Sequence, residues 1–524
     1  MNPRTIRPDP WPPLPEEALR RRQLQQLAGY LRETVIPFSA YYREKFKRAG
    51  FDPAQLRTPD DLRRIPFTAK ADFHSADAVK QFILTPDPKA LARRPSTILK
   101  ALLNGRAAVQ AGFEREFRPL LMTSTTGRSA DPVPFFYTAA DIEVLRIAGA
   151  TVMRVCGARR EQRLMNLFPF APHLAFWITH YAGKEFGVFV MDTGGGKTMG
   201  TEGNLRLLKK LRPDVLIGMP TFLYHLLTEA VAEGTELPNL CKLVLGGEKV
   251  PAGMRRKLRG LAEELGAGRP DVLCTYGFTE AKMAWAECPY PEGLESGGYH
   301  LRPELGIVEV VDPDTGEPRG PEEPGEIVFT PLAARGSVVI RYRTGDVTDG
   351  GITYAPCPHC KRRGPRLVGN IGRRSEVREM RLEKLKGTLV DFNALEHLLD
   401  DCEAVCTWQI ELRKRYDDPL EVDELILHVQ SARTVTDSSL SVYLDRLLAE
   451  RLEIRANRVV FHSEAEMREL HGVGTQLKEA RLVDRRPPAV PANGTQRNGR
   501  PRESGAGGMN GTPVAAATEG GRHD

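Results

Sequence analysis

The middle of the chain alternates short apolar runs with longer helix-like stretches, and this alternation limits the folds open to it. The apolar runs are bounded by Gly, Pro or Asp and lie at residues 164–168, 186–192, 214–220, 242–247 and 271–277. Leucine-rich stretches with helical spacing lie between them, at 204–212, 221–234 and 252–266. Strand–helix alternation at this spacing is typical of βαβ units. It predicts an α/β fold whose sheet is mostly parallel and buried on both faces.

The pattern of apolar residues differs toward both ends of the chain. Leucines at helical spacing predict helix from about residue 16 to residue 49, whereas β-like runs with turns predict a β-rich portion after residue 300. A smaller α+β region follows, and the Pro-, Gly- and Asn-rich end has the composition of a disordered tail. We therefore expect an N-terminal domain over 1–373, a C-terminal domain over 374–486 and a tail over 487–524.

Composition excludes several classes of protein. Among 524 residues, 74 basic and 68 acidic side chains leave a net charge of only +6, too diffuse for a nucleic-acid surface. No apolar run approaches the length of a membrane span, and no leader precedes the first helix, so a cytoplasmic protein is expected. Eight cysteines in such a chain are expected as thiols or metal ligands rather than disulfides.

A hydroxyl-rich loop, TSTTGRSADPVPF, begins at Thr123 after an apolar run. Backbone N–H groups and hydroxyls in such a turn can bind phosphate oxygens, although the loop by itself also fits an ordinary surface turn. A second candidate, TGGGKT at 193–198, resembles the end of a P-loop. Met191 stands where that motif needs its first glycine, so we interpret this stretch as a mobile glycine turn.

Three further motifs follow strand-like runs. GGEKVP places Gly246 and Gly247 at the end of one run, where a flat ligand can approach the backbone. YGFTE offers the ring of Tyr276 and the carboxylate of Glu280, which can hold Mg²⁺ on a phosphate. YRTGD ends in Asp346, whose carboxylate can accept hydrogen bonds from ribose hydroxyls. Each motif alone fits a strand-end turn, but their order together indicates a nucleotide site.

The ordered set TSTTGRSADPVPF, GGEKVP, YGFTE, YRTGD, GRRSE and LKEARLVDRR resembles the acyl-adenylate-forming superfamily, and within it the phenylacetate–coenzyme A ligase family. The stretches beginning IPFSAYYREKF and GTLVDFNALEHLL are also similar to that family. The resemblance covers roughly residues 20–486 and leaves out only the tail.

The resemblance implies a role for each matching position. The phosphate loop would be formed by Ser124, Thr125, Thr126, Gly127 and Arg128. The adenine site would be formed by Gly246, Gly247, Glu248, Tyr276 and Gly277. Thr279 would bind the α-phosphate and Glu280 the Mg²⁺, while Asp346 and Arg373 would bind near the ribose. Lys478 would be the catalytic lysine of the mobile C-terminal domain, which rotates about a hinge near 373–376.

The implied function is ATP-dependent activation of a carboxylic acid, followed by transfer of the acyl group to coenzyme A. An enzyme passing its acyl-adenylate to an amine, alcohol or carrier protein is a second hypothesis. A non-catalytic nucleotide- or acyl-binding descendant is a third, because Ser124, Ser375 and Leu477 replace residues usual in the family. The expected partners are the acid and coenzyme A, with a homodimer left open, and with neither nucleic acid nor a membrane span.

The turn Cys357-Pro-His-Cys360 has the spacing with which two thiolates bind one Zn²⁺. Cys288 and His300 are the nearest candidates for the other two ligands, and His359 is a spare. Some members of the resembled family carry a structural zinc there, whereas the plainer interpretation is two reduced cysteines at a turn.

The acid pocket is expected along NLFPFAPHLAFW and GMPTFLYHL, with Phe170, His173 and Met219 among its walls. These side chains suit an aromatic or apolar acid, although core packing explains any single one of them equally well.

Overall fold

The computed structural model describes residues 14–73, 76–125, 132–374, 377–382, 385–417, 421–452, 454–473 and 479–486. Several residues with a predicted role lie outside this described part of the chain. They are Thr126, Gly127, Arg128, the hinge positions Ser375 and Glu376, Lys478 and the tail 487–524.

The N-terminal helical region is bent rather than continuous. Helix α1 (Glu16–Tyr30) passes through a π-helical turn (Leu31–Val35) into α2 (Ile36–Phe38), and α3 (Ala40–Arg48) begins after a break. Ser39 has an extended backbone there, and its hydroxyl accepts a hydrogen bond from the Tyr42 N–H at 3.1 Å, which caps the new helix.

Short elements lead from this region to the first sheet. They are the 3₁₀ turns η2 (Pro53–Gln55), η3 (Pro59–Arg64) and η4 (Lys70–Phe73), then α4 (Ala76–Gln81), α5 (Pro88–Ala92), α6 (Pro95–Asn104) and α7 (Arg106–Phe117). A two-stranded antiparallel sheet follows, formed by β1 (Leu121–Ser124) and β2 (Pro134–Tyr137).

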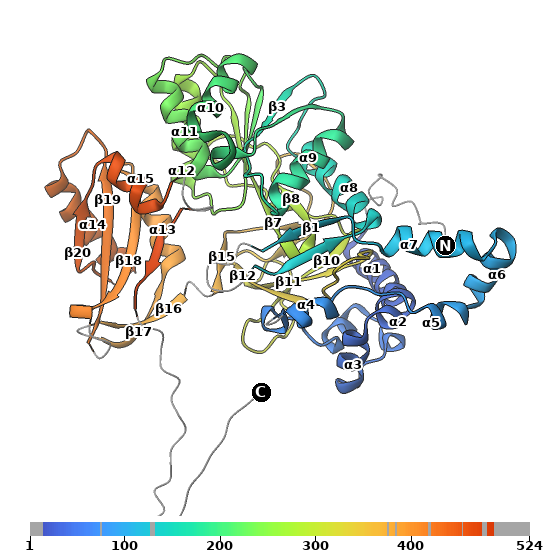
Figure 1. Ribbon diagram of the computed structural model, residues 1–524. Coiled ribbons are helices and arrows are strands. Elements are labelled where there is room, and N and C mark those ends of the chain that lie inside the picture. Colours follow the sequence, from blue (N-terminus) through green and yellow to red (C-terminus); the bar gives the residue numbers. More distant parts are fainter. Residues whose placement is uncertain are drawn as a thin grey trace, which may run out of the picture.

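The predicted parallel sheet is present at the centre of the fold (Figure 1). Its parallel strands are β3 (Arg163–Asn166), β4 (Phe189–Asp192), β5 (Val215–Gly218), β6 (Lys242–Leu245) and the first half of β7 (Asp271–Phe278). The sheet continues, antiparallel, through β8 (Met283–Ala286), β9 (Tyr299–His300), β14 (Arg366–Leu367) and β13 (Ile352–Thr353). Each apolar run predicted as a strand therefore supplies one strand of a nine-stranded sheet.

Helices cover both faces of this sheet, because alternate residues of each strand enter different cores. Leu216 of β5 packs in the core under α10 (Gly195–Leu211), α11 (Pro220–Ala232) and α12 (Ala252–Glu264). Its neighbours Val215 and Ile217 enter a second core with α8 (Ala139–Val155) and α9 (Leu174–Phe186). Burial on both faces explains why these strands appear as continuous apolar runs in the sequence.

The predicted glycine turn at 193–198 is only partly correct. Gly194 and Gly195 have positive φ and form the turn, but α10 begins at Gly195 and carries Lys197 within its first turns.

The β-rich portion forms a separate antiparallel sheet. Its strands, in spatial order, are β10 (Gly306–Val311), β11 (Gly325–Pro331), β12 (Tyr342–Thr348) and β15 (Ile371–Arg373). The last two strands pair so that Asp346 lies opposite Arg373.

The C-terminal region contains the two-stranded sheet of β16 (Val377–Leu382) and β17 (Leu385–Asp391), then α13 (Phe392–Asp401), β18 (Val405–Lys414), η7 (Arg415–Asp417), β19 (Asp423–Ser431), α14 (Asp437–Leu452), β20 (Arg458–Phe461), α15 (Glu464–His471) and β21 (Leu482–Asp484). A four-stranded sheet in the order β20-β19-β18-β21 packs against the helices around Trp408, in a core of its own. The domain boundary between residues 373 and 374 stays a prediction. The separate core of the C-terminal region supports it. Within the described ranges, no helix is both long and apolar enough to cross a bilayer.

Candidate active site

The glycine pair after β6 has a steric reason. A Cβ on Gly246 would collide with the hydroxyl of Thr275 on the neighbouring strand β7. Gly247 has a φ of +82°, in the left-handed region that other residues rarely adopt. Close packing at Gly246 and the backbone conformation at Gly247 therefore both require glycine at the carboxyl end of β6.

Glu248 follows this pair and is held at the start of α11. Its Oε2 accepts a hydrogen bond of 2.7 Å from the Thr221 hydroxyl and lies 3.4 Å from the Thr221 backbone nitrogen. The helix N-terminus favours a negative charge at this position. The loop after β6 is thereby fixed to the neighbouring helix.

Tyr276, Asp346 and Arg373 come together from three different strands. The Tyr276 hydroxyl donates to Asp346 Oδ2 at 2.8 Å, and Arg373 Nε lies 2.8 Å from Asp346 Oδ1. Burial alone would lower the pKa of Arg373, but the charge of Asp346 raises it overall. The Asp346 carboxylate is thus held from two sides by Tyr276 and Arg373, in a fixed position from which its oxygens can accept hydrogen bonds from hydroxyl groups.

Glu280 lies in the short 3₁₀ turn η5 (Thr279–Ala281) that ends β7. Its Oε1 accepts a hydrogen bond of 2.7 Å from the Tyr342 hydroxyl. Burial raises the pKa of Glu280, although this hydrogen bond opposes the rise. A buried carboxylate of this kind gains most from a cation, and its pKa falls when one binds.

The start of the phosphate loop reaches the same place. The backbone carbonyl of Ser124 lies 3.5 Å from the Thr279 hydroxyl and 3.2 Å from His173 Nδ1. Thr125 accepts a hydrogen bond from the Val133 N–H, which closes the base of the loop. The described part of the loop is therefore held beside Thr279.

The three predicted pocket residues are not equivalent. Met219 is buried next to the glycine pair after β6, since a Cβ on Gly247 would lie 3.8 Å from its Cγ. His173 lies at the phosphate loop, as described above. Phe170 is 61% exposed and packs edge-on against Phe176, so its ring forms part of an aromatic surface rather than a closed wall.

The four predicted metal ligands meet at the antiparallel edge of the large sheet. The ligand atoms of Cys288, His300, Cys357 and Cys360 all lie within 4.8 Å of one another. The spare candidate His359 lies elsewhere, with its Nε2 2.9 Å from the Glu295 carbonyl oxygen.

The distances within this cluster test whether zinc fits. The Sγ atoms of Cys288 and Cys357 are 3.6 Å apart, and Cys360 Sγ is 3.6 Å from His300 Nε2. These separations exclude a disulfide, whose sulfurs lie about 2.05 Å apart. In a tetrahedron with bonds of about 2.3 Å to sulfur and 2.0–2.1 Å to nitrogen, the edges are roughly 3.8 Å and 3.6 Å. Three thiols and one imidazole are thus spaced as ligands of one zinc ion.

Part of the C-terminal region rests on α11 and α12. Lys249, in the loop that follows β6, forms an ion pair with Glu396 at 3.0 Å, and the Gly253 N–H donates to Asp401 Oδ1 at 3.0 Å. Glu479 lies 2.9 Å from His225 Nε2. Burial opposes the charge of Glu479, but hydrogen bonds from His225 and His471 hold its pKa below the usual value. Glu479 is therefore anchored beside α11.

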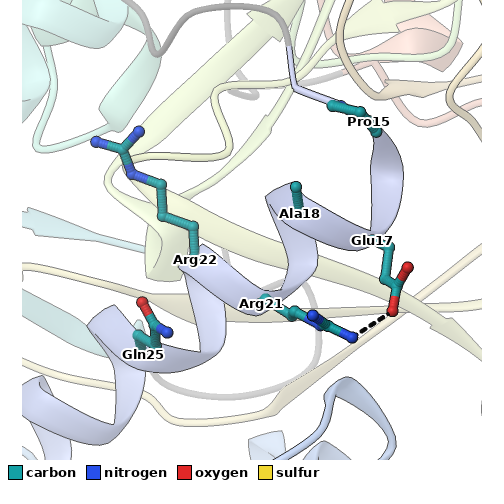
Figure 2. Close-up of a pocket in the computed structure, with 6 residues that line it drawn as sticks. All are labelled: Pro15, Glu17, Ala18, Arg21, Arg22 and Gln25. Carbon is teal, nitrogen blue, oxygen red and sulfur yellow. Dashed lines mark hydrogen bonds and ion pairs between the residues drawn. The ribbon is translucent and has the colours of Figure 1, made fainter.

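A hollow on the outer face of α1 is unrelated to these groups (Figure 2). It is lined by Pro15, Glu17, Ala18, Arg21, Arg22 and Gln25, all from one stretch of the chain. Glu17 and Arg21 form an ion pair across it at 2.6 Å. None of the residues predicted for the site lines this hollow.

Sequence patterns missed three residues that hold the site. Tyr342 begins the YRTGD motif and shares a strand face with Asp346, so the two-residue period of β12 could have revealed it. Thr221 and His225 carry no comparable signal, because only the packing of α11 against residues distant in the chain brings them to Glu248 and Glu479.

Comparisons with known proteins agree with this geometry. The family model described as AMP-binding enzyme matches residues 147–336. A phenylacetate-coenzyme A ligase of Thermus thermophilus is 29% identical over 406 residues, which cover 76% of this chain and 80% of the relative. One from Escherichia coli is 25% identical over 347 residues, covering 63% and 66% respectively.

Solved structures share the fold. A 2-hydroxyisobutyryl-CoA ligase in the postadenylation state superposes with a TM-score of 0.71 at 20% identity, covering 92% of each chain. An open conformation of that ligase gives a TM-score of 0.58 at 20% identity, over 90% of this chain and 93% of the other. The chain is thus similar to AMP-binding enzymes over residues 147–336 and to phenylacetate-coenzyme A ligases over most of its length, and its structure has the adenylate-forming fold.

Proposed function

We propose that this protein is an AMP-forming acid–thiol ligase. It activates an aryl or apolar carboxylic acid with ATP and then transfers the acyl group to coenzyme A. The observation that carries the proposal is the convergence of Tyr276, Asp346 and Arg373 beside the turn that holds Thr279 and Glu280. Among the relatives, those named phenylacetate-coenzyme A ligase support the choice of acid and acceptor.

In the first half-reaction, a carboxylate oxygen of the acid attacks the α-phosphorus of ATP. The bond from that phosphorus to the oxygen bridging to the β-phosphate breaks, and pyrophosphate leaves. Asp346 binds the ribose hydroxyls, and the glycine turn at Gly246 and Gly247 lies against the adenine. Thr279 and the loop from Ser124 to Arg128 contact the phosphates. Mg²⁺ held by Glu280 would neutralise charge on the phosphates when bound.

Lys478 is proposed as the mobile cation that compensates the charge developing in this step. Its segment is expected to withdraw as the C-terminal domain rotates about residues 373–376. In the second half-reaction, the thiolate of coenzyme A attacks the acyl carbon, and AMP leaves with the electron pair of the carbon–oxygen bond. The contact of the next residue, Glu479, with His225 supports an approach of the C-terminal region to α11 in the first step.

A structural Zn²⁺ is proposed at Cys288, His300, Cys357 and Cys360. Two distances of 3.6 Å, close to the edges of a tetrahedral zinc site, and the clustering of all four ligand atoms within 4.8 Å of one another support it. Burial lowers the pKa of His300 to about 4, so the imidazole is neutral, as a ligand must be. All four ligands come from the protein, which leaves no open position for chemistry. We place the enzyme in the cytoplasm, where its eight cysteines stay reduced. The homodimer stays a prediction, and sedimentation of the purified protein would measure its oligomeric state.

The proposal is tested by separating the two half-reactions. Purified protein is given ATP, Mg²⁺ and a panel of aryl and aliphatic acids, and pyrophosphate release and thioester formation are measured with and without coenzyme A. Lys478→Ala should abolish acid-dependent pyrophosphate release. Lys197→Ala, in the exposed lysine of the rejected P-loop-like motif, should leave it unchanged.

Each alternative has its own outcome in this assay. Pyrophosphate release that never yields a thioester would favour transfer to an amine, alcohol or carrier protein. ATP binding without turnover of any acid would favour a non-catalytic descendant. Full activity of Lys478→Ala would remove that residue from the mechanism.

A further inference from the structure

Helices α6 and α7 form a hairpin that projects from the molecule. Figure 1 shows α6 at one end of the structure and the C-terminal sheet at the other. No residue of α6 is buried, and Phe117 is the only buried residue of α7. Gly105, with a φ of +83°, joins the two helices. The hairpin is therefore held only where it meets the body of the protein.

The base of the hairpin is well anchored. Phe117 packs edge-on against Phe38 with ring centroids 5.1 Å apart, and Glu116 forms an ion pair of 2.7 Å with Arg335. Arg94 donates to the Glu33 carbonyl oxygen at 2.9 Å. These contacts fix the direction in which the hairpin points. Its exposed tip is therefore held in a defined orientation relative to the body of the protein.

The tip carries four large apolar side chains in the open. Ile98, Leu99, Leu102 and Leu103 are 47%, 58%, 78% and 73% exposed, more apolar surface than any neighbouring helix leaves uncovered. Their spacing of one, three and one residues places them on one side of α6. Exposed apolar patches of this kind mark sites of interaction with a partner or a membrane.

The charge around this patch is of one sign. Residues 88–118 contain seven basic and two acidic side chains, a local charge of +5 in a chain whose net charge is +6. No acidic residue lies between Asp87 and Glu114 in the sequence. Arg93, Lys100 and Arg106 follow or flank the apolar face directly. The complementary partner must therefore offer apolar material beneath a layer of negative charge.

We propose that the α6–α7 hairpin docks the protein on the surface of an anionic phospholipid membrane. The apolar side chains would enter the boundary between headgroups and acyl chains, and the basic side chains would contact the headgroup phosphates. A symmetric contact between two copies is disfavoured, because it would bring two segments of charge +5 together. A polyanion without apolar groups would leave the exposed leucine side chains in contact with water. The contact is peripheral and needs no membrane-spanning segment.

The position of the hairpin suits this role. Because α6 lies at the opposite end from the C-terminal sheet, docking there leaves the C-terminal region free of the membrane (Figure 1). If the proposed function holds, an apolar acid that partitions into the bilayer would be concentrated where the enzyme binds. The docking itself does not depend on that function and is tested without it.

The test is flotation of the full chain with vesicles of phosphatidylcholine, alone or mixed with phosphatidylserine. Binding is expected only to the mixed vesicles and should weaken as salt is raised, because the surface charge is screened. Leu102→Asp with Leu103→Asp should lower binding by about tenfold or more. Lys100→Glu should weaken it by several fold.

Matched controls come from α14, which also carries exposed side chains. Val442→Asp, at a position 72% exposed, and Arg451→Glu should bind as the unmodified protein does. Thermal unfolding checks that each variant is folded, and the pair Leu102→Ala and Leu103→Ala replaces the aspartates if they disturb the helix.

Three outcomes would overturn the proposal. They are no binding of the unmodified protein to anionic vesicles, equal binding by the leucine variants, or self-association through this face that those variants abolish in the absence of vesicles. The variants should keep full activity in vesicle-free solution, since these residues lie outside the catalytic machinery.

Discussion

A single methyl group on α12 should separate the C-terminal region from its docked position. A Cβ on Gly253 would lie 1.6 Å from the backbone carbonyl oxygen of Asp400 and 3.0 Å from the Asp401 nitrogen. In Gly253→Ala, α13 must therefore retreat until the first separation reaches about 3.0 Å. Asp400 cannot yield easily, because its carboxylate is held by Trp408 Nε1 at 3.0 Å and by Arg481 at 3.1 Å.

The cost follows from the contacts that this retreat disturbs. The Gly253 N–H loses its hydrogen bond to Asp401 Oδ1, and Lys257 loses or stretches its bonds of 2.6 and 2.9 Å to the carbonyls of Val405 and Cys406. Hydrogen bonds to charged groups contribute about 1.5–3 kcal/mol each, so a loss of about 3 kcal/mol is a reasonable figure. That lowers the docked population on the order of 100-fold.

The measurement is acid-dependent exchange of pyrophosphate into ATP, together with hydrogen exchange of the amides at 401–406. Gly253→Ala should slow the exchange of pyrophosphate into ATP and speed the hydrogen exchange of these amides. Gly260→Ala is the matched control, because it lies on the same helix and its Cβ would meet nothing within 4 Å. Since alanine is the better helix former by about 1 kcal/mol, Gly260→Ala should stabilise the protein slightly. Equal exchange rates in the two variants would refute the importance of this contact.

Three further predictions concern single side chains. Asp346→Ala should raise the KM for ATP about a hundredfold, because it removes the proposed ligand for the ribose, and should also lower the thermal unfolding temperature, because the buried carboxylate pairs with Arg373 and accepts a hydrogen bond from Tyr276; an unchanged KM would place the ribose elsewhere. The lowered pKa of Glu479 means that its contribution to stability is complete above the ordinary carboxyl range and is lost as the pH falls below it. Glu479→Gln should therefore flatten the decline of the unfolding temperature below about pH 4, and a slope equal to that of the unmodified protein would count against this. Cys357→Ser should remove bound zinc in metal analysis and lower the unfolding temperature by several degrees, whereas Cys241→Ser should do neither.

The central sheet was predictable because its strands obey a local rule. Residues 215–217 and 243–245 are apolar at every position, because successive residues of these strands enter cores on opposite faces of the sheet, and Gly or Pro ends each run. Helices α5 to α7 carried no such pattern. Their apolar residues face outward at the tip, so no buried stripe distinguishes them, and only the structure revealed the hairpin.

The sequence by itself determined which chemical groups the site contains. Gly246 and Thr279 follow two neighbouring strands of the large sheet, and the ends of parallel strands meet at one edge of a sheet. Asp346 was identified by its motif alone, because it lies within β12 of the separate antiparallel sheet. The CPHC turn likewise indicated two of the four residues that cluster at the proposed zinc site.

Only the tertiary structure decided how these groups face one another. The register of β12 against β15 sets Asp346 opposite Arg373, and the antiparallel edge of the large sheet brings Cys288 to Cys357 across 69 positions of the chain. Contacts of this kind depend on strand register and helix packing between distant segments. Those are fixed by the whole core at once, and no local pattern of residues encodes them.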